Sequence, residues 1–338
     1  MQKTKLYYGG LPGSGYGWGT CNTYLIRELG KLCNLVKQPT DDCILFMPLA
    51  DHDFNPVGNE RGRINLAYTF FEFPLGPNAK QNAAKYDVVF CGSTWCLEQM
   101  KRAGIKNGKV LVQGVDHSIF KPRKIEREDS EFRLFSGGKL ELRKGQDIVL
   151  EVFSRLCKQY SDMRLLTAWY NPWPETARSL DHSPYKYAQV PMNRVTQFGC
   201  LTAQQLSELM LLTDLGIFPN RCEGGTNLVM MEYAAVGKPF VASYATGHLD
   251  VLTKHNCFPL TKQAEIRNLE TMRWFEPNVE TLVNMVAEVY EAHKKYLEGG
   301  REYHSPDYMA EWTWERTARA ILSEIPSLTS TIPRLANA

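Results

Sequence analysis

The sequence lacks any long run of apolar residues. None of its 338 residues falls in a stretch approaching the roughly 18 consecutive apolar residues that a membrane-spanning helix needs. The first five residues, MQKTK, lead directly into a strand-like segment and do not have the pattern of a secretory signal peptide. The sequence therefore predicts a cytoplasmic protein without a membrane span.

Paired cysteines and metal-binding spacings are also missing. The nine cysteines include no CxxC pair, and no group of cysteine and histidine has the spacing of a zinc site. Their number is odd, and several, such as Cys43 and Cys91, lie inside apolar segments where a free thiol behaves as a small hydrophobe. We expect a reduced protein with no structural metal.

The chain has little net charge, +2 from 39 basic and 37 acidic residues, and its 43% hydrophobic content excludes a disordered chain. The balance is uneven along the sequence. Residues 1–124 carry 16 Lys and Arg against 10 Asp and Glu, a surplus of six positive charges, and the remainder carries a surplus of four negative charges. The basic part either meets an anionic partner or is an ordinary solvated surface.

Strand-like and helix-like segments alternate along the chain, which is typical of parallel α/β architecture. A length of 338 residues exceeds what one hydrophobic core usually supports. The alternation is interrupted at KPRKIEREDS, residues 121–130, a charged stretch with one large apolar residue. We predict two Rossmann-like domains, residues 1–124 and 132–305, joined by a linker at 125–131.

The first candidate binding segment is GGLPGSGYGWG, residues 9–19, between the first strand and the first helix. Glycines such as Gly13 and Gly15 allow a backbone to approach a phosphate or a sugar closely. The spacing is not GxGxxG and the chain has no GxxxxGK[ST], so a dinucleotide site and a P-loop are disfavoured. The segment binds a ligand or is only a tight turn.

The second segment is FSGGKLELRKGQD, residues 135–147. A strand ends at the pair of glycines that includes Gly138, and Lys139, Arg143 and Lys144 precede a helix. Such side chains can hold a diphosphate, assisted by the dipole of the helix that follows. The alternative is a basic loop at a solvated rim.

The third segment, PNRCEGGTNLVMMEYAAVGKP at residues 219–239, is the most specific. A strand runs into a Gly-Gly turn, and Glu223 precedes a helix that contains Glu232. The amides of Gly225, Thr226 and Asn227 would point out of the helix start, where an anion or sugar hydroxyls can bind. The alternative is a buried glutamate that merely pairs with a lysine.

In this order the three segments resemble the retaining glycosyltransferases of family 4, which have the GT-B architecture of two Rossmann-like parallel-sheet domains facing across a cleft. The likeness covers most of the chain. Residues 311–315, EWTWE, are similar to the start of the family's closing helix, so 306–338 would form a C-terminal helix that crosses back to the first domain.

The resemblance implies a hexosyltransferase that uses a nucleoside-diphosphate sugar, with UDP or GDP, as co-substrate and needs neither a cofactor nor a metal. The donor would bind the second domain and the acceptor the first. Lys139 and Lys144 would neutralise the leaving diphosphate, Glu232 would hydrogen-bond the ribose, Glu223 would lie near the donor sugar, and Gly13 and Gly15 would face the cleft. The acceptor would be an unidentified hydroxyl, on a glycan, a lipid phosphate or DNA.

Two features depart from the family pattern. Eight residues separate Glu223 from Glu232 where the family has seven. The family often has a histidine in a Thr-Phe-His pattern, and the corresponding segment here reads TFFE, residues 69–72. Glu72 would contribute in its place, or His52 would, or the role is unfilled.

Two further functions remain open at this point. Clustered lysines and arginines of the basic part, such as Lys101 and Arg102, would suit a modified-DNA acceptor or would merely keep the surface soluble. The departures from the family pattern would also suit a catalytically decayed protein that binds a sugar nucleotide without transferring the sugar.

Overall fold

The computed structural model describes residues 4–14, 17–171, 190–268, 272–298, 307–326 and 328. The chain divides into two compact units, one formed by residues 1–114 and 312–338 and the other by residues 115–311. The second unit begins ten residues before the expected boundary at 124/125. Phe120 is fully buried, and the Ser207 hydroxyl donates a hydrogen bond to the carbonyl of Ile119, so this segment packs with the unit that follows it.

The first unit is built on a parallel sheet with the strand order β2-β1-β3-β5-β6-β7. Its strands are β1 (Lys5–Tyr8), β2 (Asn34–Val36), β3 (Ile44–Ala50), β5 (Ile64–Thr69), β6 (Val88–Cys91) and β7 (Gly108–Val110), and the short β4 (Asn55–Pro56) pairs antiparallel with β3. Its helices are α1 (Gly17–Leu32), α2 (Ala79–Ala83), α3 (Thr94–Arg102) and α8 (Trp314–Ser323). The first six residues of β3 are buried because helices cover a parallel sheet on both faces.

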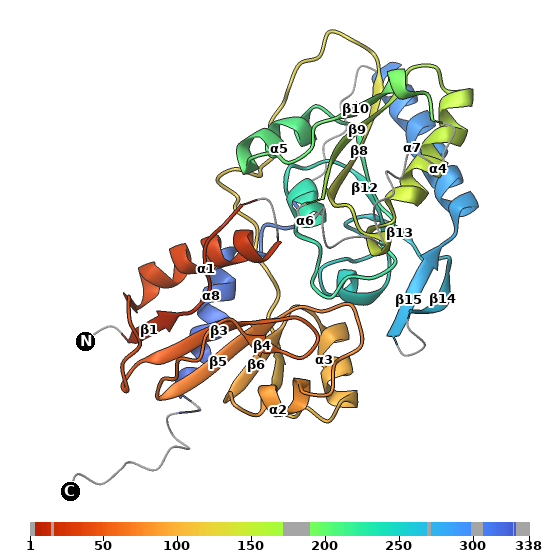
Figure 1. Ribbon diagram of the computed structural model, residues 1–338. Coiled ribbons are helices and arrows are strands. Elements are labelled where there is room, and N and C mark those ends of the chain that lie inside the picture. The colour runs from red at the N-terminus through yellow and green to blue at the C-terminus, as the bar shows by residue number, and fades with distance from the viewer. Residues whose placement is uncertain are drawn as a thin grey trace, which may run out of the picture. The chain divides into compact units, whose positions relative to one another are not determined.

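The helix α8 returns from the far end of the sequence to this first unit (Figure 1). Its Trp314 is buried and stacks on Tyr24 of α1, with 5.3 Å between the ring centroids. The Thr317 hydroxyl donates a hydrogen bond to the carbonyl of Val112. An aromatic stack and a buried hydroxyl therefore fix α8 within the first unit.

The second unit repeats the same plan, with a parallel sheet in the order β10-β9-β8-β11-β12-β13. The strands are β8 (Phe132–Lys139), β9 (Met163–Tyr170), β10 (Val195–Gln197), β11 (Leu215–Phe218), β12 (Phe240–Ser243) and β13 (Phe258–Leu260). The helices are α4 (Gln146–Gln159), α5 (Ala203–Leu211), α6 (Leu228–Ala235) and α7 (Val279–Glu298), with short 3₁₀ turns η1 (Leu142–Lys144), η4 (Met192–Arg194) and η5 (Thr246–Asp250). A two-stranded antiparallel hairpin follows β13, formed by β14 (Gln263–Asn268) and β15 (Met272–Pro277).

Alternating side chains of β8 bury both faces of this sheet. Phe132 and Leu134 join a core made with α4 and α7, and Phe135 faces the other way and stacks on Tyr233 of α6 at 5.1 Å. The two large sheets are parallel apart from β4, so the predicted pair of Rossmann-like domains is confirmed. In the second sheet, β9 and β10 lie on one side of β8, and β11, β12 and β13 lie on the other side. The strand order therefore reverses between β8 and β11, which makes this place a topological switch point.

Candidate active site

The predicted donor residues of the second unit gather where β8 and β11 end. Lys139 is the last residue of β8, and the segment 219–227 leaves β11 directly after Phe218. These two strands are neighbours in the sheet and parallel, so their carboxyl ends lie at the same edge. In open α/β sheets this edge, at a switch point, is where ligands bind.

A close contact between two loops builds the site at this edge. Gly145 has a φ of +72°, and a Cβ on it would lie 2.3 Å from the carbonyl oxygen of Pro219. Only glycine fits this position without a shift of the backbone. The N–H of Arg221 also donates to the carbonyl of Arg143 over 2.7 Å, so the loop after β8 and the loop after β11 are joined by their backbones.

Glu223 is the centre of a buried group of charges. Its carboxylate accepts from the Lys144 ammonium at 2.5 Å, the Arg143 guanidinium at 3.0 Å and the Asn220 amide at 2.5 Å. Burial by itself would raise the pKa of Glu223, but Lys144 and Arg143 outweigh it and hold that pKa below its ordinary value. Glu223 is therefore ionised at neutral pH, and it holds two cations of the loop after β8 in place.

The ion pairs continue from Glu223 to Lys139. Arg143 also contacts the Glu141 carboxylate at 2.5 Å, and Glu141 contacts the Lys139 ammonium at 2.8 Å. Burial would raise the pKa of Glu141, but Arg143 and Lys139 lower it to about 2. The two predicted lysines thus belong to one chain of five charged residues, three of them cationic. The sequence analysis did not single out Glu141, although its place two residues from each of Lys139 and Arg143 was a visible signal.

The start of α6 lies in the same loop. Asn227 caps this helix with a φ of +64°, and its side chain accepts from the N–H of Met230. Among the hydrogen bonds of the described residues, none is donated by the N–H of Gly225 or Thr226, so these two predicted amides are available to a ligand.

A turn after β12 packs against the loop that contains Glu223. The Glu223 N–H donates to the Thr246 hydroxyl at 3.0 Å, and the Gly247 N–H donates to the carbonyl of Glu223 at 3.0 Å. A Cβ on Gly247 would lie 1.8 Å from the carbonyl oxygen of Gly225. The backbone between Glu223 and Gly225 is therefore held in one conformation by direct contact with a neighbouring turn.

His248 follows in the same turn and was not found by sequence reasoning. Its Nδ1 lies 2.8 Å from the carbonyl oxygen of Ser243, and its Nε2 lies 3.3 Å from the Asn227 amide nitrogen. Burial lowers the pKa of His248, with Glu223 opposing, so the imidazole is neutral at neutral pH. A neutral ring that donates from Nδ1 can accept the Asn227 amide at Nε2, which orients the residue that caps α6.

Glu232 is a different kind of carboxylate. It lies in α6 with 8% of its surface exposed, and within the described part of the chain its carboxyl group has no hydrogen bond. Burial, with a smaller contribution from Asp116, raises the pKa of Glu232 to about 8. Burial also raises the pKa of Tyr170 to about 12, with smaller contributions from Cys200, Glu141 and Glu232. A buried carboxyl group without a partner in the protein is well suited to a hydroxyl-bearing ligand.

The remaining candidate residues, Gly13, Gly15, Glu72 and His52, belong to the first unit. The Gly13 N–H donates to the Gly19 carbonyl and to the Thr23 hydroxyl, so it already has partners within its loop, and Gly15 lies outside the described residues. Glu72 is half-buried in the loop after β5. The His52 side chain is 59% exposed, with its Nε2 3.8 Å from the Asp53 carboxylate.

The part of the chain that the structure describes contains no group of three or more His, Cys, Asp or Glu side chains that could hold a metal ion. None of its helices is long and apolar enough to cross a bilayer. The sequence prediction that a metal is not needed for the chemistry remains a prediction.

A comparison with protein families identifies the second unit. Residues 131–292 match the family described as glycosyl transferases group 1. This range contains all the site residues described above that lie in or after β8. The match places residues 131–292, most of the second unit, in this family. The architecture is GT-B, as the sequence analysis expected from the likeness to family 4.

Solved glycosyltransferase structures share the fold over nearly the whole chain. The Anabaena protein Alr3699/HepE in complex with UDP-glucose superposes with a TM-score of 0.65, with 14% identity, over 96% of this chain and 99% of that one. Sucrose-phosphate synthase from Thermosynechococcus elongatus gives a TM-score of 0.63 with 13% identity, over 98% of this chain and all of the other. At such identities these structures establish the fold.

A similar sequence among curated proteins is the gpi3 subunit of phosphatidylinositol N-acetylglucosaminyltransferase from Schizosaccharomyces pombe. It is 23% identical over 171 residues, which are 49% of this chain. The match spans 36% of the length of that relative.

Proposed function

We propose that this chain is a retaining glycosyltransferase that moves a hexose-type sugar from a nucleoside-diphosphate donor to a hydroxyl acceptor without a metal ion. The observation that carries the proposal is the ion-paired group of Lys139, Arg143 and Lys144 beside the start of α6, at the carboxyl edge of the second sheet. Three cations and two available backbone amides at one edge suit a diphosphate.

Charge on the leaving diphosphate is the main demand of this reaction. When the bond between the sugar and the diphosphate breaks ahead of acceptor attack, negative charge grows on the phosphate oxygens. Cations already fixed in position stabilise that charge without having to reorganise. Glu223 and Glu141 fix Lys144, Arg143 and Lys139 in this way before the donor arrives.

Glu232 would recognise the ribose of the donor. Its carboxyl group is buried, has no hydrogen bond among the described residues, and stands in the same helix whose first turn would face the diphosphate. Two ribose hydroxyls would donate to the carboxylate and satisfy it. UDP is the more strongly supported nucleotide, because the similar Anabaena structure is a complex with UDP-glucose; GDP remains the alternative.

The acceptor would bind the first unit, where Gly13, Glu72 and His52 are the candidate contacts. A nucleic-acid acceptor is supported only by exposed basic residues of this unit, such as Lys101 and Arg102 at the end of α3. Others of its lysines are engaged, since Lys109 pairs with Glu324 and Lys5 with Asp42. Duplex DNA bound with an affinity that falls steeply between low and moderate salt would favour that acceptor, and salt-independent binding would remove it.

The test of the proposed activity is turnover of a panel of UDP- and GDP-sugars, with products identified by mass spectrometry and the anomeric configuration by NMR. We expect transfer or slow hydrolysis with retention, and a 100- to 1,000-fold lower rate in Lys144→Ala, which removes one fixed cation. Lys254→Ala, which removes a lysine outside the site, is the matched control. Nucleotide binding without turnover of any donor would instead support the decayed binding protein.

A further inference from the structure

One arginine beside the candidate donor site uses every hydrogen-bond donor of its side chain. Arg221 lies in the loop after β11, two residues before Glu223, and its side chain is 7% exposed. A guanidinium has five N–H groups. Two of them donate to the Asp147 carboxylate at 2.8 and 2.7 Å, and two donate to the Glu276 carboxylate at 2.5 and 2.8 Å. The fifth donates to the Leu142 carbonyl at 2.7 Å.

The partners of Arg221 come from three separate elements of the second unit. Leu142 belongs to the 3₁₀ turn η1, Asp147 to the first turn of α4, and Glu276 to β15 of the hairpin. The backbone of the arginine adds two bonds, because its N–H donates to the Arg143 carbonyl at 2.7 Å and its carbonyl accepts an N–H of β15 at 2.9 Å. One residue therefore joins the loop after β11 to both the loop after β8 and the hairpin.

Residues 142–147, which we call the cation turn, are held at both ends by this guanidinium. The first and the last residue of the turn both accept from Arg221, and between them lie Arg143 and Lys144. Glu223 pairs with both of these cations and follows Arg221 by two residues. The place of the cation turn relative to Glu223 is thus fixed by the bonds of one side chain.

The guanidinium is charged at neutral pH and has no donor left for a ligand. Burial would lower the pKa of Arg221, but the hydrogen bonds to Asp147 and Glu276 outweigh it and raise that pKa further above its ordinary value. All five N–H groups already have acceptors within the protein. The arginine can therefore act on a donor only through the residues that it holds.

We propose that Arg221 is a positioning residue of the donor site, which holds the cation turn in place for the diphosphate without touching it. The inference rests on the proposed function, which assigns the diphosphate to Lys139, Arg143 and Lys144. Lysine cannot replace this arginine, because an ammonium is a compact charge with three donors and lacks the planar fork that binds two carboxylates at once. Arg221→Lys accordingly keeps the charge and releases the cation turn.

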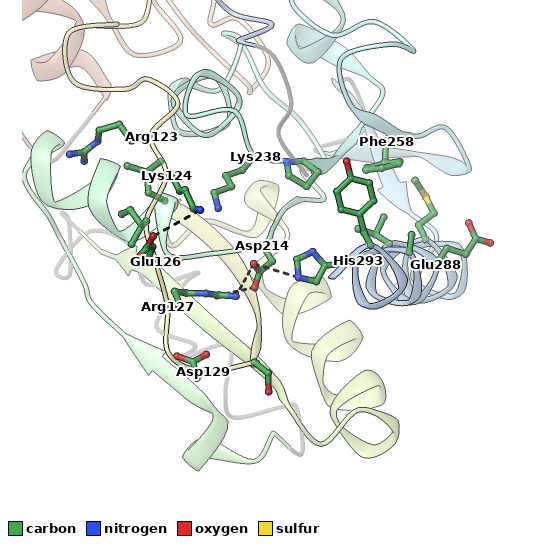
Figure 2. Close-up of a pocket in the computed structure, with 18 residues that line it drawn as sticks. Arg123, Lys124, Glu126, Arg127, Asp129, Asp214, Lys238, Phe258, Glu288 and His293 are labelled. Carbon is green, nitrogen blue, oxygen red and sulfur yellow. Dashed lines mark hydrogen bonds and ion pairs between the residues drawn. The ribbon is translucent and has the colours of Figure 1, made fainter. Parts of the chain in front are cut away.

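Arg127 offers a matched control at the opposite edge of the same sheet. Its guanidinium binds the Asp214 carboxylate through two bonds of 3.0 Å, and its side chain is 16% exposed (Figure 2). Asp214 comes directly before β11, whereas the donor residues follow this strand. Arg127→Lys should therefore disturb a buried bidentate pair of the same unit without affecting the donor site.

The test compares nucleotide and nucleoside binding in the full-length wild type and the two variants. Calorimetry measures UDP and GDP, competition measures uridine and guanosine, and circular dichroism verifies that each variant is folded. We expect the diphosphate to bind Arg221→Lys about 10-fold more weakly than the wild type, and the matching nucleoside, which lacks phosphate, to bind equally well. Arg127→Lys should leave both affinities unchanged.

Glu276→Gln disturbs the same network from the hairpin and keeps the test valid if Arg221→Lys does not fold. An amide retains one acceptor for the guanidinium, so we expect diphosphate binding to weaken about 3-fold, with nucleoside binding unchanged. Diphosphate affinity equal to that of the wild type in both variants would overturn the role of Arg221 and leave the proposed function standing. Equal losses of nucleotide and nucleoside affinity would show a structural role only. A wild-type chain that binds neither UDP nor GDP would overturn the proposed function, and this inference with it.

Discussion

Replacing Glu232 with glutamine is expected to remove a large part of the pH dependence of stability of the 115–311 unit. The carboxyl group is buried in α6, and its pKa is raised from 4.5 to about 8. Glutamine has nearly the same shape and cannot ionise. The change therefore isolates the free energy of ionising this one group in the folded protein.

The direction of this pH dependence follows from the pH at which the folded and the unfolded chain each release the proton of Glu232. Below pH 4.5 the group is protonated in both states and its ionisation costs nothing. Between pH 4.5 and 8 the unfolded chain releases the proton and the folded chain keeps it, so stability falls by about 1.4 kcal/mol per pH unit. The loss reaches about 3 kcal/mol at pH 7 and about 5 kcal/mol above pH 8, where it levels off.

The assay is urea unfolding of the wild-type chain and Glu232→Gln at pH 5, 6, 7 and 8, followed by circular dichroism. The variant should become progressively more stable relative to the wild type as the pH rises. Glu208→Gln, on the exposed side of α5, is the control for loss of a carboxylate. Parallel pH profiles for wild type and Glu232→Gln, within about 0.5 kcal/mol, would refute the raised pKa.

Three further variants test the contacts that build the two units, each by its free energy of unfolding in urea. Glu223→Gln leaves Lys144 and Arg143 buried without their carboxylate and should cost about 3 kcal/mol; a cost below about 0.5 kcal/mol would mean that solvent screens the pair. Gly247→Ala brings a Cβ against the Gly225 carbonyl and should cost about 2 kcal/mol or more, whereas Gly17→Ala, which has open space, should cost nothing. Trp314→Ala removes the stack on Tyr24 and should lower the stability of the first unit by about 3 kcal/mol, in contrast to exposed Glu315→Ala, and equal effects would contradict the role of the stack.

Much of the fold could be predicted because the pattern of apolar residues is local. The strand before Gly138 and the helix after Gly145 are visible in the sequence. The charged stretch at 121–130 suggests a domain boundary, but the second unit already begins at Val115. Strand order and the hairpin of β14 and β15 depend on pairing between distant residues, and no local pattern specifies it. In the sequence, Arg127 is one more charge in a stretch predicted to be solvated. In the structure it binds Asp214, which is 87 residues away.

The same distinction applies to the site. Lys139, Lys144, Glu223 and Glu232 stand in motifs whose spacing follows from a strand, a loop and a helix. The ion pair of Arg143 with Glu223 forms only when two loops 80 residues apart meet, and His248 contacts Asn227 from a third loop. Those contacts are tertiary, and a motif on one segment cannot reveal them.

Lys139, Arg143 and Lys144, at the carboxyl edge of the second sheet, are proposed to bind a nucleoside diphosphate. Isothermal titration calorimetry with UDP and GDP on the full-length chain tests it most directly, alongside Lys144→Ala and the control Lys254→Ala. We expect saturable binding of at least one of the two nucleotides, weakened at least 10-fold in Lys144→Ala and unchanged in Lys254→Ala. Absence of binding to both nucleotides, or equal affinity in Lys144→Ala, would contradict it.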